Sequence, residues 1–183
     1  MATQNPIEME GTYPLPEAQL DRFMFKVLVD FPTKNDLLRV LEQTTGVEDP
    51  DVRPIMNAET LIAFRDLVRR ALVATQTAEY AANLVLATHG QTPGAPAAAK
   101  RYLRFGASPR GAQSILLAAK ARALMAGRWH VSFDDIREST KPALRHRLIL
   151  NFEGEADGAE GRHQARGRQG QVAGAPPPAA QCL

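Results

Sequence analysis

One asparagine and two arginines are the residues of this chain whose types and positions suit the chemistry of phosphate groups. Asn5 follows a plausible strand end and precedes a proline, where its amide could orient a water molecule or a phosphate oxygen. Arg22 ends a short predicted helix, and Arg110 begins a long one. Arginine suits phosphate because its planar guanidinium keeps its charge, and a helix N-terminus is itself an anion site. Taken in order, the three residues suggest a nucleotide site with most of its parts missing.

Each of these residues also has a simpler interpretation when it is taken alone. Asn5 is typical of a turn before proline, and either arginine could be an ordinary surface or salt-bridge residue. Asp134 and Asp135 could be paired catalytic carboxylates, but a capping box and the first helical turn explain them, since acids favour a helix N-terminus. The histidines show no H-x-x-x-H or H-E-x-x-H spacing, so they are interpreted as surface or interface residues: His89, His130, His146 and His163.

The segment GASPRG places a serine between glycines, but it is not the G-x-S-x-G of a nucleophile elbow. Gly111 falls one place late, and no strand–elbow–helix context surrounds it. The segment is therefore not interpreted as a hydrolase nucleophile.

The composition excludes several functional classes. A chain of 183 residues allows one full domain or two small ones. Its formal net charge of +2 gives no electrostatic case for a nucleic acid or an anionic membrane as partner. Cys182 is the only cysteine, which excludes an intramolecular disulfide and a C-x-x-C zinc site and suggests a reducing, cytoplasmic setting. No run of about 18 apolar residues suggests a membrane helix.

The front of the chain predicts a short helix followed by a strand. LPEAQLDRF has apolar residues at roughly helical spacing, with Pro16 suited to a first turn. FKVLVDF, residues 25–31, is nearly continuous in its apolar residues and is typical of a strand buried on both faces of a parallel sheet. Asp30 and Pro32 end it.

The middle of the chain predicts a series of helices. Helix starts are indicated at Thr33, Asn57 and Ser132, and Gly127 would end the strongest helix, AQSILLAAKARALMAG. A helix is also predicted from about Thr77 to Thr88, a Pro/Gly/Ala loop over residues 91–99, and a last helix over PALRHRLILNF. Residues 154–183 contain few large apolar side chains and are predicted to be disordered.

Several segments of the sequence resemble a known family. ATQNPIEMEGTYPLPEAQLDRF strongly resembles the corresponding segment of MoxR-type AAA+ ATPases. GASPRG, the helix that follows it, WHVSFDDI and PALRHRLILNF continue the resemblance in the family's order. The resemblance covers roughly residues 1–153, although residues 46–100 match only in helical pattern.

The resemblance implies a fold and a division into domains. The fold would be mainly α, a helical AAA+ lid bundle preceded by a remnant of the α/β P-loop NTPase core with one or two strands. Residues 1–32 would be that core remnant, residues 33–153 the lid domain, and residues 154–183 a disordered tail.

The resemblance also implies roles for the three polar residues. Asn5 would be sensor 1, which contacts the γ-phosphate or the attacking water. Arg22 would be the arginine finger, which reaches into the nucleotide site of the next subunit and stabilises transition-state charge. Arg110 would be sensor 2, carried on the lid, and whether it acts in its own site or in a neighbour's stays open.

The family uses ATP and Mg²⁺, yet the sequence has no G-x-x-x-x-G-K-[ST] P-loop and no apolar strand ending in Asp-Glu. Both would lie before residue 1, so the chain is predicted to be the C-terminal part of such an ATPase, starting inside a larger gene. We expect it to bind neither ATP nor Mg²⁺ productively by itself. The intact family would act as a homo-oligomeric ring, usually a hexamer, in ATP-driven, chaperone-like remodelling, often with von Willebrand A-domain partners.

Two other hypotheses stay open at this stage. The first is a stand-alone helical adaptor that docks on a partner protein without ATPase activity. The second is a nucleic-acid binder with an arginine-bearing tail, which rests on Arg162, Arg166 and Arg168. Acidic residues close by in the sequence cancel the charge of these arginines: Glu155, Asp157 and Glu160.

Overall fold

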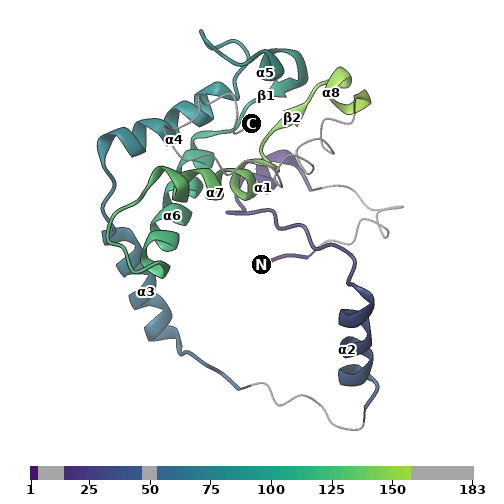
Figure 1. Cartoon of the computed structure of the whole chain (residues 1–183). Helices are drawn as coiled ribbons and strands as arrows, with labels where there is room; N and C mark the ends of the chain where they lie inside the picture. The colour runs from purple at the N-terminus through teal and green to yellow at the C-terminus, as the bar shows by residue number, and fades with distance from the viewer. Residues whose placement is uncertain (4–14, 47–52, 158–183) are drawn as a thin grey trace. The chain divides into compact units, whose positions relative to one another are not determined.

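The computed structural model describes residues 1–3, 15–46 and 53–157 of the chain (Figure 1). The described residues are mainly helical, which confirms the predicted fold class. The elements in chain order are α1 (Glu17–Leu20), α2 (Lys34–Thr44), α3 (Ala58–Arg70), α4 (Thr75–Ala87), α5 (Ala97–Tyr102), β1 (Leu103–Phe105), α6 (Pro109–Met125), α7 (Phe133–Leu144), β2 (Ile149–Leu150) and α8 (Phe152–Ala156).

The chain divides into two compact units. The first comprises Met1–Lys26 together with Ala71–Leu183, and the second comprises Val27–Arg70. In the first unit α6 packs against both α4 and α7, and α5, β1, β2 and α8 form a small subdomain at one end (Figure 1). Its core combines large aliphatic side chains with alanines, which let the helices approach closely: Ala81, Leu84, Ile115, Ala119, Ala123, Ile136, Ala143 and Leu144.

The helix starts follow the local signals in the sequence. The Asn57 side chain accepts a hydrogen bond from the backbone N–H of Thr60 at 2.8 Å, and Thr33 caps α2 in the same way through Asp36. Ser132 and Asp135 form the predicted capping box at the start of α7. Gly127 has φ +72°, the left-handed conformation that ends α6. These four predictions are confirmed.

The small sheet was not predicted. Strands β1 and β2 pair antiparallel, with Leu103 opposite Leu150 and Phe105 opposite Ile149. The helix predicted over PALRHRLILNF is therefore wrong beyond Leu144, where α7 ends and the chain turns toward β2. Asn151 fixes this arrangement because its side chain donates to the Arg101 carbonyl at 2.7 Å and accepts from the Gly154 N–H at 2.9 Å, capping α8. Tertiary pairing here overrides the local pattern.

The strand predicted over residues 25–31 is also absent from the structure. These residues have no regular secondary structure, and the one sheet among the described residues consists of β1 and β2. The side chains of Val29 and Phe31 are 91% and 86% exposed. An apolar run becomes a buried strand only when neighbouring strands satisfy its backbone and cover its faces, and the described residues supply no such neighbours.

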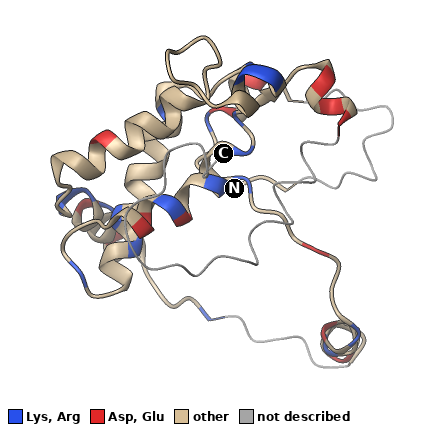
Figure 2. Cartoon of the chain, turned by 45° about the horizontal axis from the view of Figure 1, so that its top comes forward, with Lys and Arg blue, Asp and Glu red and all other residues tan. Residues whose placement is uncertain are grey.

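The second unit contains α2 and α3, neither of which has a buried residue. Both helices carry exposed apolar side chains: Leu37, Leu38, Val40 and Leu41 in α2, and Leu61, Ile62, Phe64 and Leu67 in α3. Within the described part of the chain, no helix is both long and apolar enough to cross a membrane. Figure 2 shows basic and acidic residues interspersed along the helices, in agreement with the small net charge.

A partly buried ion pair stabilises the start of α7. Asp135, 5% exposed, accepts two hydrogen bonds from the Arg128 guanidinium at 2.8 and 2.9 Å and one from the Ser132 N–H at 2.9 Å. Burial alone would raise the pKa of Asp135, but these hydrogen bonds from Arg128 and Ser132 outweigh burial and lower the pKa to about 2. Because the folded protein holds this carboxylate below its unfolded pKa, the pair stabilises the fold above about pH 4.

We expect this contribution, roughly 2 kcal/mol, to disappear as the pH falls from about 4 toward 2. Urea unfolding at a series of pH values measures it. Asp135→Asn should unfold more easily than the unaltered chain at pH 6, and the two should converge in acid. Asp134→Asn is the matched control, because Asp134 is 79% exposed and pairs with Arg137 at the surface, where ion pairs contribute little. Parallel curves for Asp135→Asn and the unaltered chain would contradict the expectation.

Candidate functional site

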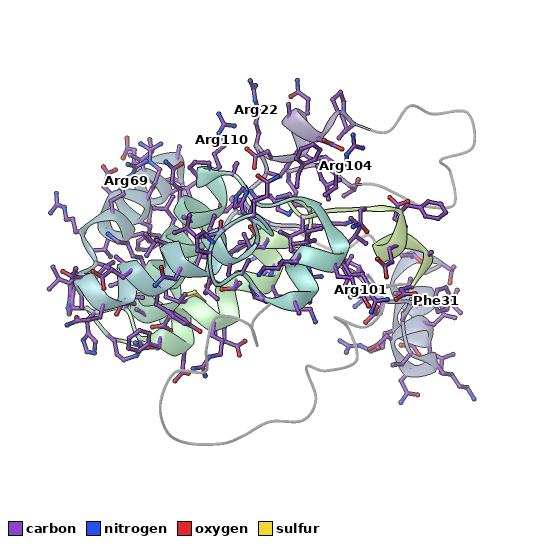
Figure 3. All side chains as sticks on the ribbon, turned by 90° about the horizontal axis from the view of Figure 1, so that it is seen from above. Arg22, Phe31, Arg69, Arg101, Arg104 and Arg110 are labelled. Carbon is purple, nitrogen blue, oxygen red and sulfur yellow. The ribbon has the colours of Figure 1, made fainter. Side chains whose placement is uncertain are left out.

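The structure locates two of the three predicted site residues. Asn5 lies outside the described residues. Arg22 lies in the turn that follows α1, and Arg110 lies in the first turn of α6. Figure 3 shows both side chains extending from the same edge of the molecule, away from the body of the first unit.

Arg22 has a free guanidinium within the part of the chain that the structure describes. Its backbone N–H donates to the Gln19 carbonyl at 3.2 Å, which fixes the turn, while its side chain is exposed. Among residues 15–46 and 53–157 no carboxylate pairs with it. An exposed arginine on a fixed turn is available to an anion outside the chain.

Arg110 stands at a well-formed helix N-terminus. Pro109 occupies the first turn, and Ser108 caps the helix by accepting a hydrogen bond from the Arg110 N–H at 3.2 Å. The Arg110 side chain is 53% exposed, with its Nε 4.0 Å from Asp21 Oδ2. The helix dipole adds to the positive potential at this end of α6.

The loop before α6 is held by close backbone contacts. Thr88 Oγ1 accepts a hydrogen bond from the Ala107 N–H at 2.9 Å. A Cβ added at Gly106 would come within 2.6 Å of that oxygen and 2.8 Å of the Thr88 backbone, so a side chain at this position requires the loop to shift. The N-terminus of α6 is thus positioned by α4.

Asp21 brings the two arginines together. Its Oδ1 accepts a hydrogen bond from the Ser108 hydroxyl at 2.7 Å, and its Oδ2 faces Arg110. Since Asp21 immediately precedes Arg22, the turn that carries one arginine is bonded to the helix cap beside the other. The arrangement can present two guanidinium groups to one polyanionic ligand.

Arg147 was not predicted as a site residue, yet it is the most extensively bonded side chain here. It is 6% exposed and donates from Nε to Asp21 Oδ1 at 3.1 Å. From Nη2 it donates to the carbonyls of Asp21 and Phe23 at 2.9 and 2.7 Å. Burial lowers the pKa of Arg147, while the charge and hydrogen bond of Asp21 act in the opposite direction. The signal in the sequence is slight, because Arg147 is one of two arginines that flank a histidine in the segment LRHRLIL.

His146 adds a further contact to the same turn. Its Nε2 lies 2.9 Å from the Phe23 carbonyl and 2.9 Å from Arg147 Nη1. Burial lowers the pKa of His146, the Phe23 hydrogen bond opposes this, and the charge of Arg147 lowers it further. His146 is therefore a structural residue at an internal contact.

The remaining candidates from the sequence have structural roles where the structure describes them. His89 Nε2 lies 3.0 Å from the Ala107 carbonyl, and His163 lies outside the described residues. Asp134 and Asp135 bond to separate arginines, as the capping interpretation requires. No cluster of three or more His, Cys, Asp or Glu residues that could hold a metal ion occurs in the described ranges. The residues present fit phosphate groups, and the described carboxylates do not fit a Mg²⁺ site.

Comparison with known families matches the two parts of the first unit separately. Residues 1–25 match the family described as ATPase family associated with various cellular activities (AAA), and residues 95–166 match the AAA lid domain. The first match includes Arg22, and the second includes Arg110 and Arg147.

Comparison with whole proteins gives relatives that include MoxR proteins. The chain is 38% identical to Chaperone MoxR1 of Mycobacterium tuberculosis over 86% of its own length and 41% of the relative's. It is 29% identical to Protein MoxR of Paracoccus denitrificans, over 82% of this chain and 48% of that protein. A solved structure, of a candidate ATPase from Cytophaga hutchinsonii, superposes with a TM-score of 0.78 at 36% identity, covering 88% of this chain and 49% of that one. The chain spans less than half the length of these relatives.

Proposed function

The chain belongs to the MoxR-type family of AAA+ ATPases, and from this premise we propose that it supplies the arginine-bearing lid portion of an ATP-driven chaperone. In this proposal Arg22 is the arginine finger and Arg110 is sensor 2. Asn5 would be sensor 1. Both arginines would bind phosphate oxygens of the same nucleotide, which is bound by an adjacent subunit.

One observation carries the proposal, namely the bonded contact between the Arg22 turn and the N-terminus of α6. The Asp21–Ser108 hydrogen bond of 2.7 Å places the turn against the helix cap, with both arginine side chains directed outward (Figure 3). A surface salt-bridge role does not explain the position of Arg22, because its side chain has no partner among the described residues. Two cations presented together suit the spread negative charge of a triphosphate in its transition state.

The assembly and its partners are part of the same proposal. Family membership supports an oligomeric ring, for which we propose a hexamer, and a von Willebrand A-domain protein as partner. A finger that acts in trans needs an adjacent subunit, so the exposed position of Arg22 agrees with a ring. ATP would supply the phosphates that the two arginines bind, and Mg²⁺ would depend on residues other than the described carboxylates of this chain.

We expect the purified chain to raise the ATP turnover of a MoxR-type ATPase whose own arginine finger has been replaced by alanine. The chain would dock on the finger-deficient subunit and provide Arg22. Steady-state phosphate release, measured with increasing amounts of chain, tests this against the sum of the two proteins assayed alone. Binding without a gain in turnover would support the helical adaptor instead. If the chain neither binds the ATPase nor raises its turnover, both functions are contradicted.

A further inference from the structure

The turn that carries Arg22 is fixed to the lid helices through one buried side chain. Arg147 bonds at the same time to the Asp21 carboxylate, to the Asp21 and Phe23 carbonyls, and to Ser114 Oγ of α6 at 3.1 Å. It also donates to the carbonyls of Ala143 and Met24. The planar fork of arginine is the one side chain that can reach this many acceptors at once.

A second set of contacts holds the same segment against the end of α7. The Lys26 N–H donates to the Pro142 carbonyl at 3.0 Å, and His146 Nε2 lies 2.9 Å from the Phe23 carbonyl. The segment after Arg22 therefore follows α7 rather than moving independently of it.

Asp21 connects Arg147 to Arg110. One of its carboxylate oxygens receives both the Arg147 Nε–H and the Ser108 hydroxyl, and the other faces Arg110. Arg147 side-chain atoms are 2% exposed, so the charge of Asp21 is the main compensation for burying this cation. Loss of either member leaves the other charge without its partner.

We propose that Arg147 and Asp21 act as a positioning pair that sets the separation and direction of Arg22 relative to Arg110. This inference rests on the proposed function, since the pair would hold the arginine finger, Arg22, at a fixed position relative to sensor 2, Arg110. In this proposal neither residue contacts the nucleotide. A displacement of α6 or α7 moves the Arg22 turn with it, so the state of the lid determines where the finger points.

A distance measurement tests the pair without any need for activity. Spin labels are placed at Arg22→Cys and Arg122→Cys in a Cys182→Ser background, because both arginines are exposed and Arg122 lies near the far end of α6. We expect a narrow distance distribution by double electron–electron resonance. Asp21→Asn and Arg147→Met should each broaden or shift it, and Arg147→Lys, which keeps the charge but not the fork, should not restore it.

The control variant is Arg128→Met, which removes the partly buried Arg128–Asp135 ion pair of the same unit without touching the turn. It should lower thermal stability and leave the distance distribution unchanged. Asp21→Asn keeps the inference testable if Arg147→Met fails to fold, since Asp21 is 25% exposed. An unchanged distribution in folded Asp21→Asn would overturn the proposal.

The activity assay separates this inference from the proposed function. Added to the finger-deficient ATPase, Asp21→Asn should restore roughly 10- to 100-fold less turnover than the unaltered chain, as misplaced groups of this kind do. If the unaltered chain restores no turnover, the proposed function fails while the distance measurement still decides the positioning role. If Asp21→Asn restores turnover in full, the pair does not position the finger.

Discussion

The Arg22→Ala chain is expected to lose all measurable turnover that the unaltered chain restores to a finger-deficient MoxR-type ATPase. An arginine finger contributes roughly 10³ to 10⁵ in rate, because it stabilises charge that develops on the transferring phosphoryl group. Arg22 is exposed and has no partner among the described residues, so its removal should leave the fold intact. Phosphate release under saturating ATP, with helicity measured by circular dichroism, checks both parts of the expectation.

Two further variants sharpen the interpretation of this result. Arg22→Lys keeps one positive charge but loses the planar fork, and should restore only a small part of the turnover. Arg122→Ala, which removes an exposed arginine near the opposite end of α6 from Arg110, should behave like the unaltered chain. Turnover that survives Arg22→Ala, or that falls equally with Arg122→Ala, would show that the gain does not come from a finger at residue 22.

The elements that could be predicted from the sequence are those whose causes lie within one helical turn. Thr33, Asn57 and Ser132 each cap the helix that begins beside them, and their partners lie three residues away. Gly127 ends α6 through its own backbone conformation. Because such signals act within one turn, the longer helices α2, α3, α4, α6 and α7 were predicted close to their observed positions. The short helices α5 and α8 were not predicted, and α5 begins inside the loop predicted over residues 91–99.

The features that could not be predicted depend on residues far apart in the sequence. The β1–β2 pair joins Leu103 to Leu150, and neither strand has a pattern that distinguishes it from its surroundings. Arg147 and Asp21 are separated by 126 positions. An arginine in the segment LRHRLIL and an aspartate in a turn give no indication in the sequence that they pair. The resemblance therefore led to Arg22 and Arg110, while the pair that holds them became visible only in the structure.

The failed prediction at residues 25–31 has a different cause. The apolar pattern of FKVLVDF is typical of a segment buried in a sheet, but the pattern alone does not supply the neighbouring strands. Val29 and Phe31 are consequently exposed among the described residues. The sequence pattern of a segment indicates which of its faces could be buried. Whether the segment is buried depends on the elements that surround it.

Leu84→Ala is expected to destabilise the first unit by about 3 to 5 kcal/mol, the range for leucines truncated in a closed core. Leu84 lies in α4, is fully buried, and belongs to the cluster that α4, α6 and α7 share. The backbone of three packed helices cannot close over the cavity that the lost methyl groups leave, so both transfer and cavity terms contribute. Urea unfolding monitored by the fluorescence of Trp129, the single tryptophan of the chain, measures the change.

Leu86 provides a matched control on the same helix. It lies two residues further along α4 and is 51% exposed, so Leu86→Ala makes the identical chemical change on the solvent side. Its cost should stay below about 1 kcal/mol, because little apolar area is lost and alanine favours the helix. A large difference between the two variants would show that α4 packs against α6 and α7 in solution through the face that carries Leu84. Equal effects would mean that α4 is rotated or does not pack against α6 and α7. The hydrogen bond from the Ala107 N–H to Thr88 Oγ1 would then not position the N-terminus of α6.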